Sequence, residues 1–506
     1  MKRFVRTLFI ITLIVISVPT LTAQRFKAFS NDPTLTQEEM RTFAATLPKE
    51  KQKQAEEVLL KFDEFWNSSQ MSEEFQMQFI EVGNLMLRKN LRFFPHFEAY
   101  IKAFDAFANS DMTDYNRQWL KMIQYNVNHD LSRFDKVMNN YVNIFNDNII
   151  QLTPNSRWTA YGYIEKIGMD EEPYFEYKDI DLVGAGSRDS VEIIGTSGKY
   201  YPSSARWNGT KGSIYWYKAG LNGQVKATFD NYTVDTRQPK VRVENAKMYY
   251  PELFGAPVLG VVEDKAGLET DEEKITYPRF KSYDDELVVR NIYKNVDYIG
   301  GIELRGASIQ GYSSEGKLAK LYIKKNNKNV VSVQSIHYLF KDETVRANDA
   351  RVNVYVEEDS IYHPSANFYY NETASQVLIS RPKYGVGRSP FFDSYHKMDI
   401  TAESLSWDIS TSKVEFKPMT GATNQSSATF ESQNFFNNAT MREFLGTNDE
   451  NPLYTMYKIY QATNYKPVSF EGVRRYFNKS SEDIKALMIQ MAANGFIEYD
   501  VNNDKI

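Results

Sequence analysis

The sequence predicts a multidomain α+β protein with an N-terminal antiparallel helical bundle, a large all-β region and a small C-terminal helical module. The main observation is a change in the spacing of apolar residues, from a helical period to a period of two near Thr153-Pro154, and back to helical spacing near the C-terminus. The second observation is length, because 506 residues suggest roughly three domains. The third is an aromatic content of 14%, dominated by Tyr and Phe, which favours half-buried strands.

We expect the following division of the chain. Residues 1–23 form a signal peptide, 24–35 a linker, 36–152 the helical bundle, 153–435 the all-β region and 436–506 the C-terminal module.

The N-terminus has the features of a secretory signal. A basic stretch, Lys2 to Arg6, precedes an apolar run from Leu8 to Val18, and Leu21-Thr22-Ala23 offers a cleavage site before Gln24. The run is short for a membrane span, although an uncleaved anchor is the alternative. Since no later segment is apolar for about eighteen residues, the mature chain is expected not to span a membrane. The prediction is export to the periplasm or outer envelope of a Gram-negative type cell.

Composition excludes several classes of function. The chain has no cysteine, so it can form no disulfide, use no thiol in catalysis and carry no lipid on a cysteine. The net charge of −5 argues against nucleic acid as a partner, because such binding needs a basic surface. Envelope proteins or glycans are the expected partners.

Residues 36 to about 150 carry the helical pattern. Thr36-Gln37-Glu38-Glu39 matches a capping box, and Ser72, Thr113 and Asp130 are good N-caps at later breaks. Apolar residues recur at i, i+3 and i+4, as in Phe62, Phe65 and Trp66. Five or six helices with short connections predict an antiparallel bundle whose aromatic stripes form its core.

The next region alternates with a period of two and is punctuated by turn signals such as Asn208-Gly209 and Asn222-Gly223. Residues 225–246 and 345–379 show a similar cadence of short strands without a fixed period, which is typical of solenoid-like or jelly-roll layers. In this cadence, Val330 to Lys417 resembles the OstA-type periplasmic β-domains of lipopolysaccharide-transport proteins. The resemblance implies an elongated β structure without catalytic residues.

The last residues are again helical. Pro452 to Gln461, Val468 to Phe477 and a helix capped by Ser480 precede Gly495 and the strand Phe496 to Tyr499. This order resembles a winged-helix module. Since the return strand of the wing would only begin at Lys505-Ile506, we expect the chain to be part of a longer polypeptide.

The sequence suggests no catalytic residue, metal ligand or cofactor. The five histidines, His96, His129, His337, His363 and His396, are too widely spaced for a metal motif. Gly195 to Tyr200 lacks the spacing of a phosphate loop, and the acidic clusters lack the order of a calcium loop. Whether any carboxylates pair in space stays open at this stage.

The candidate ligand-binding residues are Trp207, Tyr215, Trp216 and Tyr217, because aromatic side chains on a β surface can stack on sugar rings. The alternative is that they fill the β core. Strict alternation puts Tyr215 and Tyr217 on one side and Trp216 on the other. It also predicts that Trp207 and Trp216 are not both buried on the same face.

Two functions remain open. The first is an exported, non-catalytic envelope scaffold or binding protein, with helical ends as docking surfaces. The alternative is a carbohydrate-active enzyme on a β scaffold, which would need two carboxylates facing one sugar. DNA binding through the C-terminal module is opposed by export and by the acidic chain.

Overall fold

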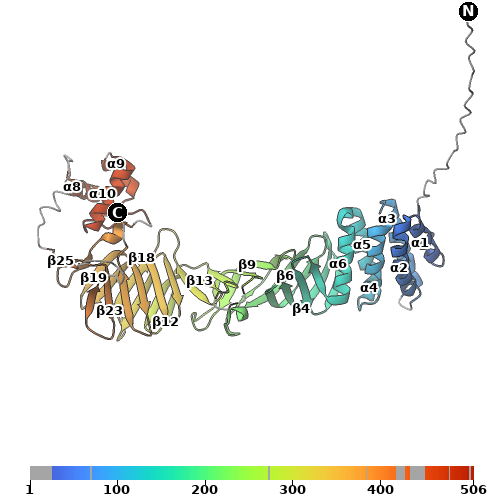
Figure 1. The fold of residues 1–506 in the computed structure, drawn as a ribbon, viewed down its shortest axis with the longest axis horizontal. Coiled ribbons are helices and arrows are strands. Elements are labelled where there is room, and N and C mark those ends of the chain that lie inside the picture. The colour runs from blue at the N-terminus through green and yellow to red at the C-terminus, as the bar shows by residue number, and fades with distance from the viewer. Residues whose placement is uncertain are drawn as a thin grey trace, which may run out of the picture. The chain divides into compact units, whose positions relative to one another are not determined.

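The computed structural model describes residues 26–68, 71–269, 271, 274–382, 385–417, 428–433, 451–477, 479–500 and 503–506. The expected signal peptide and residues 436–450 lie outside these ranges. Helices, strands and helices follow one another along the chain, as the sequence predicts (Figure 1). The chain forms two compact units: one holds the helices up to Ile150 with Ile164–Glu176 and Tyr201–Ser204, and the other holds Gln151–Tyr163, Tyr177–Tyr200 and Ala205–Ile506.

The N-terminal region is helical over residues 36–147, as expected. Its α-helices are α1 (Thr36–Ala45), α2 (Lys49–Trp66), α3 (Glu73–Arg88), α4 (Glu98–Ala108), α5 (Asn116–His129) and α6 (Phe134–Asp147). Short helical turns η1 (Phe93–Phe97), η2 (Thr113–Tyr115) and η3 (Leu131–Arg133) precede the last three.

The expected caps are formed only in part. Ser72 caps α3, its hydroxyl accepting a hydrogen bond from the Phe75 amide at 3.3 Å. At α1 the expected capping box is absent, because the helix begins with Thr36 itself and the Glu39 carboxylate accepts from the Ser30 amide instead. The turn before α1 is held by Asp32, whose carboxylate accepts from the Thr34 amide at 3.0 Å.

The core of the helical unit is aromatic. Phe79 stacks on Tyr100 with ring centroids 4.7 Å apart, and Phe107 stacks on Trp119 at 4.3 Å. All four side chains are fully buried. One strand residue joins this core: the ring of Phe175 lies 5.7 Å from that of Tyr141. The helical unit is therefore completed by chain from beyond the helices.

Strands begin at Ile149, before the expected boundary. They are β1 (Ile149–Leu152), β2 (Arg157–Tyr161), β3 (Ile164–Met169), β4 (Pro173–Ala185), β5 (Ser190–Tyr201), β6 (Arg206–Tyr215), β7 (Lys226–Phe229), β8 (Tyr232–Asp235), β9 (Lys240–Tyr249), β10 (Val258–Lys265), β11 (Arg279–Ser282), β12 (Leu287–Tyr293), β13 (Val296–Arg305), β14 (Ser308–Tyr312), β15 (Ala319–Lys325), β16 (Lys328–Ser335), β17 (His337–Lys341), β18 (Thr344–Val356), β19 (Asp359–Asn371), β20 (Gln376–Ser380), β21 (Phe391–Asp393), β22 (Met398–Thr401), β23 (Ser404–Asp408), β24 (Val414–Lys417) and β25 (Thr429–Ser432). Short turns η4 (Tyr217–Ala219) and η5 (Gly385–Arg388) interrupt them.

The strands form an antiparallel meander in which several short strands lie end to end. The pair β7 and β8 follows β6, with Phe229 opposite Gly212 and Tyr232 opposite Gly209. Further along, β13, β15, β16, β18, β17 and β14 pair in a closed antiparallel ring, which is the connectivity of a six-stranded barrel. Pairing between neighbours in the chain explains why the sequence shows only short, local strand signals.

The alternation of buried residues shifts by one position in the middle of many strands. In β6, Trp207 and Gly209 are buried, Thr210-Lys211 faces solvent, and Gly212 and Ile214 are buried again. The same two exposed residues occur at Lys178-Asp179, Asp230-Asn231, Glu244-Asn245 and Asn348-Asp349. At Glu244-Asn245 the register between β9 and β10 shifts by one residue, which is a β-bulge. Across Thr210-Lys211 the register of β6 with β7 and β8 is unbroken, so there the buried face changes without an inserted residue.

Tyrosines fill the core of the closed ring of strands. Tyr298 and Tyr338 are buried with ring centroids 5.5 Å apart, and their hydroxyls donate to main-chain carbonyls of Gly301 and Val333. Gly311 is needed here, because a Cβ at this position would come within 2.6 Å of the Tyr298 hydroxyl. Each buried phenol therefore has a hydrogen-bond partner.

The C-terminal helices are α8 (Pro452–Ala462), α9 (Phe470–Phe477) and α10 (Ser481–Ala493). The predicted cap and stop are confirmed: the Ser480 hydroxyl accepts from the Asp483 amide, and Gly495 ends α10 at a φ of 76°. The helices enclose a core that contains Met456, Ile459, Val473, Ile484, Met488 and Met491, together with Val386 from the β region. The Ser389 hydroxyl also donates to the Ala492 carbonyl at 2.8 Å, so these helices pack on the β region around η5.

The return strand expected to be cut short is paired on both sides. Lys505 exchanges backbone hydrogen bonds of 2.8 and 3.1 Å with Asp500, and Ile506 exchanges two of 2.9 Å with Val468. Ile506 is buried. Residue 502 of the expected turn lies outside the described part of the chain.

Candidate binding cleft

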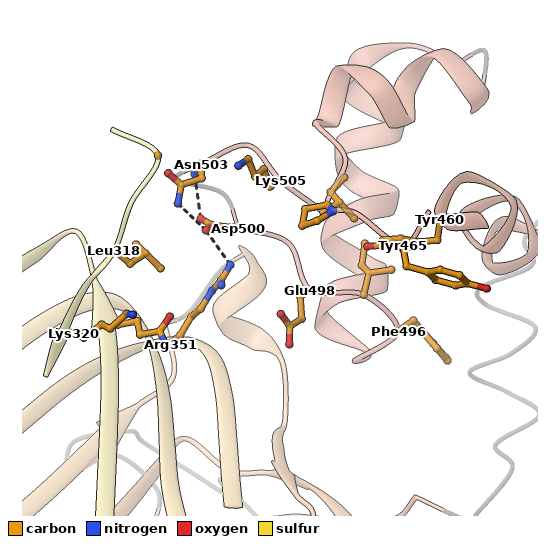
Figure 2. Close-up of a pocket in the computed structure, with 15 residues that line it drawn as sticks. Leu318, Lys320, Arg351, Tyr460, Tyr465, Phe496, Glu498, Asp500, Asn503 and Lys505 are labelled. Carbon is orange, nitrogen blue, oxygen red and sulfur yellow. Dashed lines mark hydrogen bonds and ion pairs between the residues drawn. The ribbon is translucent and has the colours of Figure 1, made fainter. Parts of the chain in front are cut away.

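A cleft of about 600 Å³ lies between the C-terminal module and the outer face of the β region (Figure 2). The module contributes Tyr460 of α8 and residues that follow α8 and α10, and the β region contributes β15, β16, β18 and the loop before β15. Charged side chains gather at one end of the cleft and aromatic ones at the other, with Glu498 between them.

The wall on the β region is a row of polar side chains across three strands. Lys320 on β15 is directly opposite Gln334 on β16, and Gln334 is opposite Arg351 on β18. Directly opposed residues share one face of a sheet, so these three side chains lie side by side. The loop residues Gly316 and Leu318 flank the row.

The opposite wall is formed by residues that follow α10, where Asp500 makes an isolated antiparallel bridge with Lys505. The Asp500 carboxylate forms an ion pair with Arg351 at 2.9 Å and accepts hydrogen bonds from Asn503 at 2.8 and 3.1 Å. Glu498 lines the same wall. Lys505 lines the cleft from the return strand.

The aromatic end comprises Tyr460, Tyr465 and Phe496. Tyr465 has 69% of its surface exposed and Phe496 has 44%. Tyr465 follows the end of α8, and Phe496 follows the end of α10. The Tyr465 amide donates a hydrogen bond to the Tyr460 carbonyl, and the Phe496 amide donates one to the Met491 carbonyl. Main-chain bonds therefore hold the backbone from which these exposed rings project.

The tyrosine hydroxyls near Glu498 remain protonated at neutral pH. Burial raises the pKa of Tyr362, and the Glu498 carboxylate, which is hydrogen-bonded to it, raises it further. Burial and the same carboxylate also raise the pKa of Tyr460. Both phenols can therefore donate hydrogen bonds.

Two cations of the cleft have no anionic partner. Among the described residues, neither Lys320 nor Lys505 forms an ion pair, whereas Arg351 is neutralised by Asp500. The lysines come from opposite walls and are both exposed. The cleft can thus offer two ammonium groups to a ligand.

The aromatic residues singled out in the sequence lie elsewhere. Trp207 and Trp216 are both fully buried. The two adjacent exposed residues Thr210-Lys211 shift the alternation of buried positions between them, whereas strict alternation places the two indoles on opposite faces. The Trp207 indole donates to the Tyr232 hydroxyl at 3.1 Å, as a core side chain should.

Tyr215, the last residue of β6, and Tyr217, the first residue of η4, lie beside each other, and Trp216 between them is buried. The two tyrosine rings stack in parallel with centroids 5.0 Å apart, and the Lys226 ammonium lies 5.5 Å from the Tyr215 ring centroid. Tyr217 is 59% exposed and Tyr215 is half-buried. None of the four aromatic residues lines the cleft, and a ligand at the tyrosine pair stays a prediction.

Sequence reasoning missed every residue that lines the cleft. Lys320, Gln334 and Arg351 are ordinary outward-facing polar residues in three separate strands. The strand predicted over Phe496 to Tyr499 is not formed, because only Asp500 bridges the return segment, at Lys505. The one available signal was Phe496, an exposed aromatic residue two positions before Glu498.

The isolated histidines do not form a metal site in the described part of the chain. There, no three His, Asp or Glu side chains gather in a way that could hold a metal ion. His363 is instead a buried side chain whose Nε2 lies 3.1 Å from the Ser389 carbonyl. No described helix is long and apolar enough to cross a bilayer.

Comparison with models of protein families, with curated proteins and with solved structures finds no match for this chain. The cleft must therefore be interpreted from its own chemistry.

Proposed function

We propose that this chain is an exported, non-catalytic binding protein of a Gram-negative type cell envelope, whose β region is a scaffold and whose cleft is the binding site. The cleft itself carries the proposal. Its volume of about 600 Å³ is in the range of pockets that bind small organic ligands, which is about 300–1,000 Å³. Exposed aromatic rings and unpaired cations converge there, as binding sites require.

Export rests on the N-terminal sequence. The basic stretch, the apolar run and the site before Gln24 support a cleaved signal peptide. Intact-mass measurement of protein taken from native envelopes should give a chain that starts near Gln24. A chain that retains Met1 would contradict cleavage.

Fold details support a scaffold role. The antiparallel meander with mid-strand bulges is consistent with a solenoid-like or jelly-roll layer and with the OstA-type resemblance. The helix order with Lys505 paired to both Asp500 and Ser469 is consistent with a winged helix. Winged helices also serve in protein docking, so this likeness does not imply DNA binding. The N-terminal helices are proposed to pack as an antiparallel bundle.

The alternative, a carbohydrate-active enzyme, draws support from Glu498 and Asp500, which lie two residues apart in the cleft. Both carboxylates are engaged, however. Asp500 is held by Arg351 and Asn503, and Glu498 by Tyr362. These contacts favour a role in holding the walls of the cleft over proton transfer, since a general acid–base pair must meet the substrate directly.

The test is thermal unfolding of the mature protein with separate glycan, lipid and protein fractions of the envelope. At least one fraction should raise the melting temperature, since binding to the folded state stabilises it. Tyr465→Ser should lose this shift, while Tyr476→Ser, an exposed tyrosine on α9 outside the cleft, should retain it. A shift unaffected by Tyr465→Ser, or no shift with any fraction, would overturn the proposal.

A further inference from the structure

The two ends of the cleft recognise different chemistry. At the aromatic end, Tyr465 and Phe496 present exposed rings from a backbone that is held by main-chain hydrogen bonds. At the charged end, Lys320, Lys505 and Arg351 bring donors from both walls. A ligand that fills the cleft therefore needs an apolar face and a negative group close to each other.

The charges of the cleft side chains indicate that this ligand group is an anion. Arg351 and Asp500 cancel each other in their ion pair at 2.9 Å. Glu498 is left against two lysines, and its carboxylate already accepts a hydrogen bond from Tyr362. The side chains that line the cleft therefore carry a net positive charge. An anion bound between the two lysines gains charge-assisted hydrogen bonds.

The polar side chains between the two ends suit hydroxyl groups. Gln334, Asn503 and Arg351 carry planar donor groups, and the Gln334 and Asn503 amides also accept hydrogen bonds. A sugar ring has an apolar C–H face for an aromatic ring and hydroxyls at its rim for such planar groups. An acidic peptide would supply the charge but not the rim of hydroxyls.

We infer that the cleft binds an acidic glycan, with carboxylate-bearing sugar units between Lys320 and Lys505 and a neighbouring ring on Phe496 and Tyr465. This inference rests on the proposed binding function and names its ligand class. The carboxylate of the glycan pairs with the two lysines, which form no ion pair among the described residues, and the aromatic end holds the adjacent sugar unit.

The experiment is isothermal titration calorimetry of the mature protein with oligogalacturonate, with an uncharged oligosaccharide of equal length and with a poly-glutamate peptide. Oligogalacturonate should bind, and its affinity should fall as salt is raised because its charges are screened. The double variant Lys320→Gln/Lys505→Gln should weaken binding at least tenfold, and Phe496→Ala should weaken it as well. Lys485→Gln, an exposed lysine of α10 outside the cleft, should leave binding unchanged.

Each other result overturns the inference in a distinct way. Equal binding of the uncharged sugar, lost in Phe496→Ala, would leave the binding function standing and remove the acidic class. Equal binding of poly-glutamate would show that carboxylate alone is recognised and not sugar. If no probe binds while an envelope fraction still stabilises the protein through Tyr465, the ligand class is wrong and the proposed function survives. Failure of both experiments removes both.

Discussion

At the scale of the residue, a break in the alternation of a strand decides which side chains are buried. Trp207 and Trp216 differ by nine positions, so uninterrupted alternation would place them on opposite faces. The two adjacent exposed residues Thr210-Lys211 break the alternation, and both indoles are fully buried. Burial of a large aromatic side chain contributes strongly to stability, whereas an exposed neighbour contributes little.

We expect Trp216→Ala to lower the free energy of unfolding by about 3–5 kcal/mol, because it removes a buried aromatic side chain and leaves a cavity. Tyr217→Ala is the matched control and should change it by less than about 0.5 kcal/mol, since Tyr217 is largely exposed. Urea unfolding followed by tryptophan fluorescence measures both. Similar losses in the two variants would contradict the core position of Trp216.

His363 predicts a pH dependence. Burial, and to a lesser extent the nearby Arg381, lowers its pKa to about 3. The unfolded chain takes up a proton near pH 6.5, which the folded chain cannot do until about pH 3. The contribution is therefore complete above the unfolded pKa and is lost as pH falls, at about 1.4 kcal/mol per pH unit.

The measurement is the free energy of unfolding between pH 7 and pH 4 for the protein and for His363→Gln. The variant should lose less stability on acidification than the original chain. His129→Gln, at an exposed position, should follow the original curve. Parallel curves for His363→Gln and the original chain would show that residue 363 does not carry the effect.

At the scale of the element, the breaks in alternation need residues that tolerate a left-handed backbone. Asp179, Asn231, Asn245 and Asp349 all have φ values between 48° and 57°. Asn and Asp adopt this conformation far more readily than other residues except glycine. The sequence therefore carries an Asn or Asp where these strands shift face, and at four of the breaks this residue is the second of the two exposed positions.

Substitution at Asn245 tests this requirement. Asn245→Val should destabilise the protein by about 1–3 kcal/mol, because a β-branched side chain is strained at positive φ. Asn245→Gly should be close to neutral, since glycine adopts that conformation without a clash. Chemical denaturation of the two variants measures the difference. Equal stability of the valine and glycine variants would rule out a left-handed residue 245.

At the scale of the whole molecule, the boundary between the two compact units does not follow the boundary between helices and strands. Ile164–Glu176 and Tyr201–Ser204 belong to the helical unit, although they come from strands and a turn. The Ser203 hydroxyl donates to the Asn126 side chain at 2.9 Å, and Phe175 packs on Tyr141. The helical spacing of apolar residues alone could not have assigned these segments to the helical unit.

A fragment of residues 26–152 should unfold cooperatively, because its helices share an aromatic core. It should melt at a lower temperature than the helical unit of the full chain, because it lacks Phe175 and leaves part of Tyr141 uncovered. Calorimetry of the fragment, and of the full chain with Phe175→Ala, tests this. A fragment as stable as the full chain would mean that the later segments add nothing.

The sequence by itself determined the type and order of the elements. Apolar spacing is set by the local period of helix or strand, and caps such as Ser480 and stops such as Gly495 act within a few residues. For the same reason it separated Trp216 from Tyr215 and Tyr217, its direct neighbours in the chain.

The tertiary structure decided the face of each half-strand and the place of the cleft. One break in alternation reverses the face of every following position, and sequence alternation cannot register a shift that depends on a partner strand. The cleft brings Lys320, Gln334 and Arg351 from three strands opposite residues about 150 positions later, where Asp500 binds Arg351. Such a site is made by strand pairing and by packing of the last helices around η5, and both are contacts between segments far apart in the chain.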